Sequence, residues 1–370
     1  MQCADVIKHI EQWLPKATAW DGDNVGIQIG DERRKVKNIL LSLDLTEKVV
    51  DEAVRKNCNF IFTHHPVLFH PIRKLDFKND TTSKVVGKVI KKDLLVYSAH
   101  TNLDFAKDGV SFQLAKKLEL IKIRFLSNFS ANHFKLAVFV PSSHLEKVAD
   151  ALHNSGAGVI GEYSNCSFRT TGTGTYKGSA ISNPTVGKKG IREIVEETKL
   201  EVLVNSWDIS KIISTLKKVH PYEEVAYDIY PLKNENVNYG FGAIGTLTKT
   251  MSLNEFLKFV RRKLRAKSLR FVKGTKSGIK NVAVCGGSGS RLLNEAISSK
   301  ADAFITADIK YHTFQDAEEK ILLIDAGHYE TEIHSLDEVQ KRLRRLLNDN
   351  RKIKVLKYRG STNPISFYNN

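Results

Sequence analysis

An alternation of short apolar runs with amphipathic segments constrains this chain most strongly, and it begins near the N-terminal end. Apolar runs at 39–43, 60–62 and 94–97 are separated there by helical patterns at 47–56 and 83–92. Short strands separated by helices predict a largely parallel α/β sheet.

The last third of the chain repeats this alternation. Its strand-like and helical stretches are, in chain order, 282–284, a helix beginning near 291, 303–305, 321–324 and a helix over about 332–347. We therefore expect residues 1–125 and 236–370 to be the two halves of one α/β domain.

The middle of the chain, residues 126–235, has a different pattern. Extended runs alternate there with helical ones, at 135–140, 145–154 (helical), 166–176, 190–198 (helical), 200–204, 210–219 (helical) and 225–230. A doubled β-α-β order of this kind is typical of a ferredoxin-like α+β sandwich, so we predict an inserted domain. Residues 170–183, rich in glycine, threonine and serine, predict turns or a mobile loop.

Length and composition set the broad class of protein. A chain of 370 residues is longer than one ordinary core requires, which favours two or three units. The residues are 41% apolar and 26% charged, and no apolar run approaches the roughly 18 residues of a membrane span, so we expect a soluble globular protein. Residues 1–15 predict an amphipathic helix rather than an export signal. The cysteines are scattered without a CxxC pair, which argues against a zinc ribbon or a disulfide framework and favours the cytoplasm.

The formal charge of +16 raises the question of nucleic acid, because clustered lysine and arginine release counterions from phosphate backbones. Basic residues concentrate in 255–280 and 341–359. We interpret these segments either as solvated helix faces or as basic surfaces that attract a small anionic ligand. Nucleic acid ranks last as a partner, because no aromatic stacking platform or recognised nucleic-acid motif accompanies them.

Two adjacent histidines, His64 and His65, end the apolar run at 60–62 just before Pro66. Adjacent side chains inside a strand point to opposite faces. Where the strand ends, both imidazoles can face the crevice at the carboxyl edge of the sheet, where open α/β folds bind ligands. A surface or capping role is the alternative for such a pair.

The next strand also ends in residues of ligand type. Asp104 follows the run at 94–97, so we expect its carboxylate beside the histidine pair, with His100 as an outer-shell partner. An N-cap of the helix that begins near Gly109 is the alternative role for Asp104.

A third set follows the run at 321–324, where His328 and Glu332 lie four residues apart and would share one face of a helical turn. Mixed nitrogen and oxygen ligands suit zinc, iron, manganese or nickel, and five of them are more than one catalytic metal requires. We therefore predict two divalent metal ions with Glu332 as the bridge. The predicted ligands are His64, His65, Asp104, His328 and Glu332.

Two further motifs follow strands of the second series. Asp308 and His312 are predicted as outer-shell or substrate-facing groups, because metal-bound imidazoles donate their second nitrogen to such partners. The segment 285–290 (CGGSGS) lies between a strand and a helix, where its backbone N–H groups could bind an anion. A tight turn is the equal alternative for this segment.

The motifs together resemble the family of GTP cyclohydrolase 1 type 2 homologues, the dinuclear-metal proteins also described as NGG-one-interacting-factor-three-like. The motifs that carry the resemblance are WDGDNVG at 20–26, THHP at 63–66, HTNLD at 100–104, CGGSG at 285–289, TADIK at 306–310 and GHYETE at 327–332. The resemblance covers nearly the whole chain and implies the same five metal ligands.

The resemblance also implies an insertion and an assembly. The middle module, with HPYEEVAYD at 220–228, looks like the insertion of some family members, which is similar in fold to PII and CutA-type domains. Ring-shaped homohexamers are implied as well. Ala307 departs from the family pattern, in which glycine is common, and WDGDN at 20–24 is one residue longer than the usual spacing.

These observations favour a metal-dependent hydrolase that acts on a nucleotide or phosphorylated small molecule, with GTP as the substrate that the family name implies. No catalytic residue is assigned. The alternative is a metal-handling or regulatory hexameric assembly without turnover.

Overall fold

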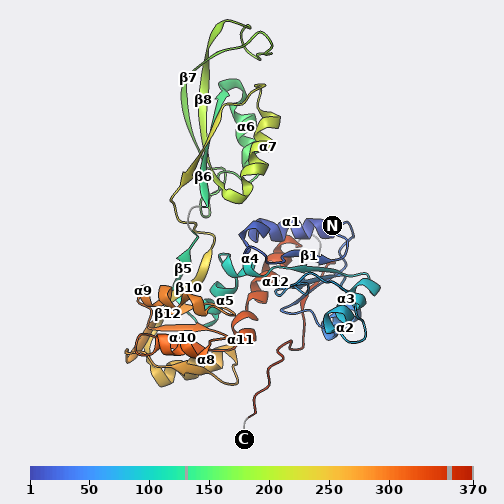
Figure 1. Cartoon of the computed structure of the whole chain (residues 1–370), viewed down its shortest axis with the longest axis vertical. Helices are drawn as coiled ribbons and strands as arrows, with labels where there is room; N and C mark the ends of the chain where they lie inside the picture. The colour runs from blue at the N-terminus through green and yellow to red at the C-terminus, as the bar shows by residue number, and fades with distance from the viewer. Residues whose placement is uncertain (130–131, 348–351, 369–370) are drawn as a thin grey trace. The chain divides into compact units, whose positions relative to one another are not determined.

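The computed structural model describes residues 1–129, 132–347 and 352–368 (Figure 1). Contacts divide the chain into two compact units, Met1–Ser127 with Tyr239–Asn370, and Asn128–Asn238. The prediction of a mixed α/β fold is confirmed, since helices alternate with the strands of three sheets. Within the described ranges no helix is long and apolar enough to cross a bilayer.

The first unit contains a five-stranded sheet built from the start of the chain and one late strand. Its strands, in spatial order, are β1 (Gly26–Ile29), β4 (Leu95–Ser98), β3 (Phe60–Thr63), β2 (Ile39–Ser42) and β15 (Val355–Lys357). All neighbours are parallel except β1, which runs antiparallel to β4. The helices of this region are α1 (Cys3–Trp13), α2 (Glu47–Arg55) and α3 (Thr81–Lys91). The N-termini of α2 and α3 are stabilised locally, because the side chains of Thr46 and Asp80 cap them.

A six-stranded sheet forms the rest of the first unit. Its strands, in spatial order, are β11 (Arg270–Val272), β14 (Leu322–Asp325), β13 (Ala303–Thr306), β12 (Gly278–Val284), β10 (Gly240–Ser252) and β5 (Ile121–Asn128). The central β12, β13 and β14 are parallel. On β13, Phe304 and Ile305 belong to hydrophobic clusters on opposite faces of the sheet, so it is buried on both sides. The helices beside this sheet are α8 (Leu253–Leu264), α9 (Leu293–Ser298) and α10 (Tyr311–Ala317).

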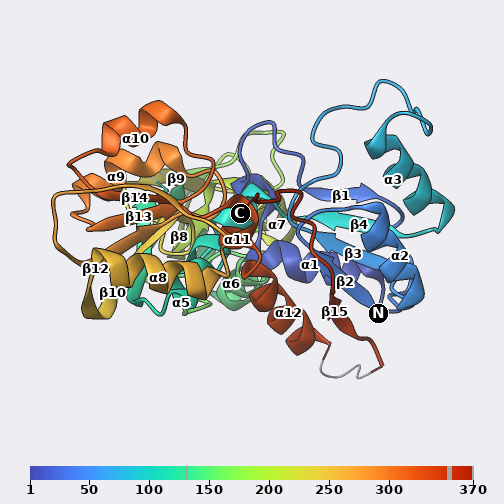
Figure 2. The same ribbon diagram turned by 90° about the horizontal axis from the view of Figure 1, so that it is seen from below.

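Four further helices lie between the two sheets of the first unit (Figure 2). They are α4 (Thr101–Phe105), α5 (Val110–Lys117), α11 (His328–Glu332) and α12 (Ser335–Leu346). Short 3₁₀ turns occur at η1 (Lys16–Thr18), η2 (Ser142–His144), η3 (Ser206–Asp208) and η4 (Ser290–Leu292). Because α4 follows β4 and α11 follows β14, each sheet sends a chain segment from its carboxyl edge into this central region.

The second unit has the element order β-α-β-β-α-β. Its elements are β6 (His133–Pro141), α6 (Leu145–Asn154), β7 (Ser167–Lys177), β8 (Arg192–Asn205), α7 (Ile209–Val219) and β9 (Tyr227–Leu232). The sheet order is β7-β8-β6-β9, and every pair is antiparallel. Its core packs Val138 and Leu200 of the sheet against Val148 and Ile212 of the two helices.

One expectation for this unit is wrong, and another is wrong in part. The predicted helix at 190–198 is the first half of β8, whose residues pair with β7 from Arg192 onward. β-branched residues such as Ile194 suit this ladder, and pairing along its whole length outweighs a helix-like spacing. In the glycine-rich segment 170–183, the residues up to Lys177 are strand rather than loop, whereas 178–183 lie outside the strand and include a turn, as expected. Gly174 fits there because a Cβ at this position would lie 2.0 Å from Glu197 Oε2 on β8.

Candidate metal centre

The two adjacent histidines lie just past the end of β3. The backbone N–H of His65 donates to the carbonyl of Leu43 at 2.9 Å, beyond the end of β2. The chain has therefore left the regular ladder, and the two imidazoles are no longer forced to opposite faces. Their ring centroids lie 4.8 Å apart, at the carboxyl edge of the sheet.

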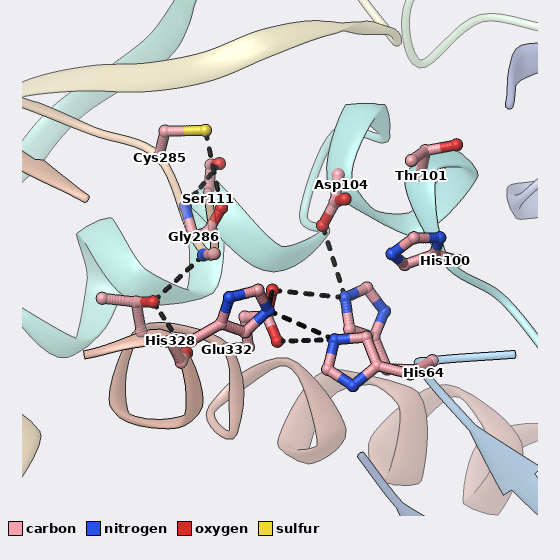
Figure 3. Close-up of polar contacts among 12 residues, drawn as sticks. His64, His100, Thr101, Asp104, Ser111, Cys285, Gly286, His328 and Glu332 are labelled. Carbon is pink, nitrogen blue, oxygen red and sulfur yellow. Dashed lines mark hydrogen bonds and ion pairs between the residues drawn. The ribbon is translucent and has the colours of Figure 1, made fainter. Parts of the chain in front are cut away.

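Asp104 is carried to the same edge by α4. Asp23 holds the start of this short helix, since its carboxylate accepts hydrogen bonds from the N–H and the hydroxyl of Thr101 at 3.1 and 2.5 Å. Asp104 Oδ1 then lies 3.6 Å from His64 Nε2 (Figure 3). The structure assigns Asp104 to this cluster and not to the cap of α5, whose N-cap residue is Gly109.

His328 and Glu332 reach the cluster from the second sheet. Gly327, with φ +91°, lets the chain leave β14 and turn directly into α11. The two residues lie one helical turn apart, and His328 Nε2 is 3.0 Å from Glu332 Oε1, as the spacing predicts.

The buried carboxylate of Glu332 is the meeting point of the cluster. Its Oε1 lies 3.7 Å from His64 Nε2, and its Oε2 lies 3.1 Å from His65 Nε2. The ligand atoms of His65, His328 and Glu332 fit within 4.8 Å of one another, and so do those of His64, Asp104 and Glu332. The five predicted residues are thus brought together, although they lie far apart in the chain. Figure 3 labels four of them, His64, Asp104, His328 and Glu332.

Each histidine of the cluster is oriented through its other ring nitrogen. The Nδ1 atoms of His64, His65 and His328 lie 2.9, 2.7 and 2.6 Å from the Ala99 carbonyl, Asp44 Oδ1 and Asp308 Oδ2. A ring that donates its Nδ1 proton to such an acceptor presents an Nε2 lone pair to the centre.

Buried polar atoms without partners support this chemistry. His64 Nε2 and Asp104 Oδ1 are buried and have no hydrogen-bond partner within the described part of the chain. His65 Nε2 and His328 Nε2 face each other at 3.4 Å. Buried polar atoms without hydrogen-bond partners are unfavourable unless a cation or a proton lies between them. The residues therefore fit a metal site of nitrogen and oxygen donors.

The electrostatics of the metal-free cluster follow from its mixed charges. Burial alone would raise the pKa of Glu332, but His64, His328 and His65 hold this pKa well below its usual range. Burial opposes protonation of His65 and His328, yet the pKa of His65 is raised to about 10 by Asp44 and Glu332, and that of His328 to about 9 by Glu332 and Asp308. Protons therefore occupy the histidines when no cation does.

Comparison with known proteins identifies the family of this chain. A family model described as Duf34/NIF3 (NGG1p interacting factor 3) matches residues 1–364. The chain belongs to the Duf34/NIF3 family. It is 40% identical over 347 residues to a protein of Halalkalibacterium halodurans named GTP cyclohydrolase 1 type 2 homolog, covering 93% of this chain and 92% of the relative.

Two further Duf34/NIF3 relatives cover nearly the whole chain. A Bacillus subtilis protein with the same name is 38% identical over 365 residues, which is 98% of this chain and 97% of that protein. The crystal structure of a Bacillus cereus protein related to NIF3 superposes with a TM-score of 0.85 at 36% identity, covering 100% of this chain and 99% of the other.

Of the three residues predicted to lie around the ligands, His100 and Asp308 contact the cluster and His312 does not. His100 lies against the cluster, with ligand atoms of His64, His65 and His100 within 4.8 Å of one another, and its Nδ1 is 2.9 Å from Asp23 Oδ1. Asp308 contacts His328, as noted above. His312 does not join the cluster, because it is exposed on α10 and its Nδ1 lies 2.9 Å from Gln315 Oε1.

The segment 285–290 forms a packed turn. The N–H groups of Gly286, Gly287 and Gly289 donate to the side chains of Ser111, Thr331 and Thr306 at 3.4, 3.0 and 2.9 Å. These donors are therefore satisfied within the fold, which favours the tight-turn alternative over an anion cradle. Burial raises the pKa of the neighbouring Cys285 thiol to about 12, so this thiol stays protonated and is not a nucleophile at neutral pH.

Sequence reasoning missed three residues beside the centre of this Duf34/NIF3 chain. Asp44 orients His65, Asp23 orients His100, and Arg291 lies in a recess next to the ligands. Asp44 had a detectable signal, because it follows the apolar run at 39–43 and so lies at the same carboxyl edge as the histidine pair.

Proposed function

We propose that this protein is a metal-dependent hydrolase that holds two divalent cations and acts on a nucleotide or phosphorylated small molecule. The single observation that supports this is the position of Glu332, which belongs to two ligand groups at once. His64 and Asp104 would hold one cation with Glu332, and His65 and His328 would hold the other with the same carboxylate.

Each part of the cluster has a defined task in this proposal. When bound, a pair of divalent cations lowers the pKa of water and stabilises the oxyanion that develops during hydrolysis. Asp44 and Asp308 keep their imidazoles in the ligand tautomer. His100, fixed by Asp23, lies beside His64 and His65.

The printed name of the curated relatives makes GTP the first substrate to test. Purified protein loaded with zinc, iron, manganese or nickel in turn is incubated with GTP, other nucleotides and phosphoesters, and release of formate or phosphate is measured. We expect turnover by the native protein and its loss in Glu332→Gln. Glu318→Gln is the matched control, because Glu318 is exposed on the surface and lies outside the cluster.

The rival function is a metal-handling or regulatory assembly without turnover. It is favoured by the separate compact unit Asn128–Asn238, none of whose described residues belongs to the cluster. Readily exchanged metal together with no turnover of any tested nucleotide or phosphoester would select this rival over the hydrolase.

The proposal extends to the inserted unit, the assembly and the location of the protein. We infer a PII/CutA-like fold for the inserted unit from its β-α-β-β-α-β order, and a homohexamer from the family resemblance. A cytoplasmic location is consistent with four free cysteines. Light scattering coupled to gel filtration tests the hexamer directly.

A further inference from the structure

A recess of about 320 Å³ opens beside the metal ligands. Asp104, His328 and Glu332 form part of its lining, so a molecule inside it contacts the centre. This volume is at the lower end of the range for small-molecule sites, which suits a mononucleotide-sized ligand rather than a polymer.

Aromatic rings line much of this recess. Trp20 and Phe105 have ring centroids 5.3 Å apart, and Phe105 and Phe241 lie edge to face at 4.8 Å. Phe69 adds a further ring, 6.2 Å from His100. Rings arranged in this way offer flat apolar surface to a planar group.

Arg291 contributes the positive charge of the recess. Its guanidinium lies 3.5 Å above the centroid of the Trp20 ring and 5.7 Å from that of Phe241. Among residues 1–129, 132–347 and 352–368, it forms no ion pair and donates no hydrogen bond. The indole thus fixes the plane of the guanidinium while its N–H groups remain available.

Two other stacked arginines make the contrast clear. Arg342 lies 4.0 Å above the Trp13 ring, but it also pairs with Glu338 at 3.0 Å. Arg270 lies over Phe314 and pairs with Asp325. In both cases a carboxylate of the protein pairs with the guanidinium, whereas Arg291 has the same stacked geometry with no carboxylate of the described residues at ion-pair distance. Asp104 and Glu295 lie near enough only to oppose the lowering of its pKa by burial.

We propose that the recess binds a small molecule with both a planar ring and a phosphate group, with the phosphate on Arg291 and the ring against the aromatic wall. This inference rests on the proposed function, because it names the substrate class of the same centre. The phosphate would meet the guanidinium through paired N–H donors, and the rest of the molecule would extend toward Asp104 and Glu332. The neighbouring glycine turn does not compete for this role, because the N–H groups of Gly286, Gly287 and Gly289 are already donated within the protein.

Calorimetric titration of the full-length, metal-free protein tests this assignment without interference from cations. The probes are guanosine 5′-monophosphate, guanosine, inorganic phosphate and acetate. Arg291→Gln should weaken binding of the monophosphate and of inorganic phosphate about tenfold or more, because hydrogen bonds to a charged group are lost. Binding of guanosine should be unchanged. Arg261→Gln is the matched control, since Arg261 is an exposed arginine of α8 outside the recess.

Several results would overturn the proposal. If Arg291→Gln and the native protein bind the monophosphate with equal affinity, Arg291 does not bind the phosphate. If acetate binds as tightly as phosphate, the recess has no preference for phosphate. If Arg291→Gln does not fold, Arg291→Lys replaces it, because lysine keeps the charge and loses the planar fork. Affinity equal to the native value in that variant also overturns the proposal. A lack of turnover by metal-loaded protein would contradict the hydrolase alone, since these titrations contain no metal.

Discussion

Asp44 Oδ1 lies 2.7 Å from Nδ1 of His65, and the other oxygen of the same carboxylate accepts a hydrogen bond from the Thr362 hydroxyl at 2.5 Å. A residue near the end of the chain therefore fixes a carboxylate that in turn fixes a ligand imidazole. Asn363 strengthens this attachment through its side-chain amide, which donates to Glu330 Oε1 at 3.0 Å.

Replacement of Asp44 should weaken metal binding without touching a ligand. In Asp44→Ala the ring of His65 loses its acceptor, and we expect the affinity for zinc to fall about 10–100-fold. Competition with a chromogenic chelator measures this affinity. Asp51→Ala, which removes an exposed carboxylate paired with Lys88, should leave it unchanged. Equal affinities of the two variants would contradict the orienting role of Asp44.

Thr362→Val should lower zinc affinity less than Asp44→Ala does, because it acts on the same carboxylate without removing it. The carboxylate of Asp44 remains but is less firmly held, so we expect zinc affinity to fall by about 3–10-fold, within the usual worth of one hydrogen bond. Because Thr362 acts through Asp44, adding Thr362→Val to Asp44→Ala should cause no further loss in the same chelator assay. Additive losses would mean that the two residues act independently.

Gly287 is required by the position of Glu332. Its φ is +60°, and a Cβ would lie 2.2 Å from Glu332 Oε1. Gly161 has nearly the same φ, +59°, with no atom within 4 Å of a Cβ. We expect Gly161→Ala to cost roughly 1–2 kcal/mol of unfolding free energy from backbone strain alone. Gly287→Ala should cost roughly 2–5 kcal/mol because the clash adds to the strain.

Only one of these two glycine variants should affect the metal centre. Urea denaturation measures the unfolding free energies, and zinc stoichiometry measures binding. Gly287→Ala should lose zinc because Glu332 is displaced, whereas Gly161→Ala should bind it normally. Normal zinc binding by Gly287→Ala would show that Glu332 need not approach this backbone.

The metal-free protein should lose stability as the pH rises above neutrality. The pKa values of His65 and His328 are raised from 6.5 to about 10 and about 9 in the folded state. Folding therefore favours their protonated forms, and this contribution is complete below about pH 6.5, the unfolded value. It is lost as the pH rises through 9 and 10.

Urea denaturation of chelator-treated protein between pH 6 and pH 10 checks this slope. His65→Gln separates the histidine contribution from that of ionising thiols, and its unfolding free energy should fall less over the same range. Zinc replaces the protons, so zinc affinity should instead increase with pH. A native profile identical to that of His65→Gln would contradict the raised pKa of His65.

Much of the centre could be predicted because its ligands follow strand ends. In a parallel sheet the carboxyl ends meet at one edge, so His64, His65 and Asp104 could be grouped from the pattern of apolar runs alone. The spacing of His328 and Glu332 gave their common helical face. The number of donors favoured Glu332 as the bridge, but position in the chain could not give its distances to His64 and His65, since these depend on how α11 packs against the first sheet.

Other features were hidden from the sequence for physical reasons. Residues 192–198 carry a spacing that suits a helix as well as a strand, and only pairing with β7 decides between them. Arg291 gave no signal, because one arginine in a strongly basic chain stands out only when its stacking partner Trp20, distant in sequence, is known.

The parallel pairing of β15 with β2 has a consequence for biosynthesis. A ribosome makes β2 and the first three ligands early, then the whole insert and the second sheet, and only afterwards the strand that covers β2. Until then the nascent chain exposes the unpaired edge of β2, although His328 and Glu332 of α11 are made before β15. A chain that stalls after α11 but before β15 therefore has all five residues of the cluster and still carries an aggregation-prone edge.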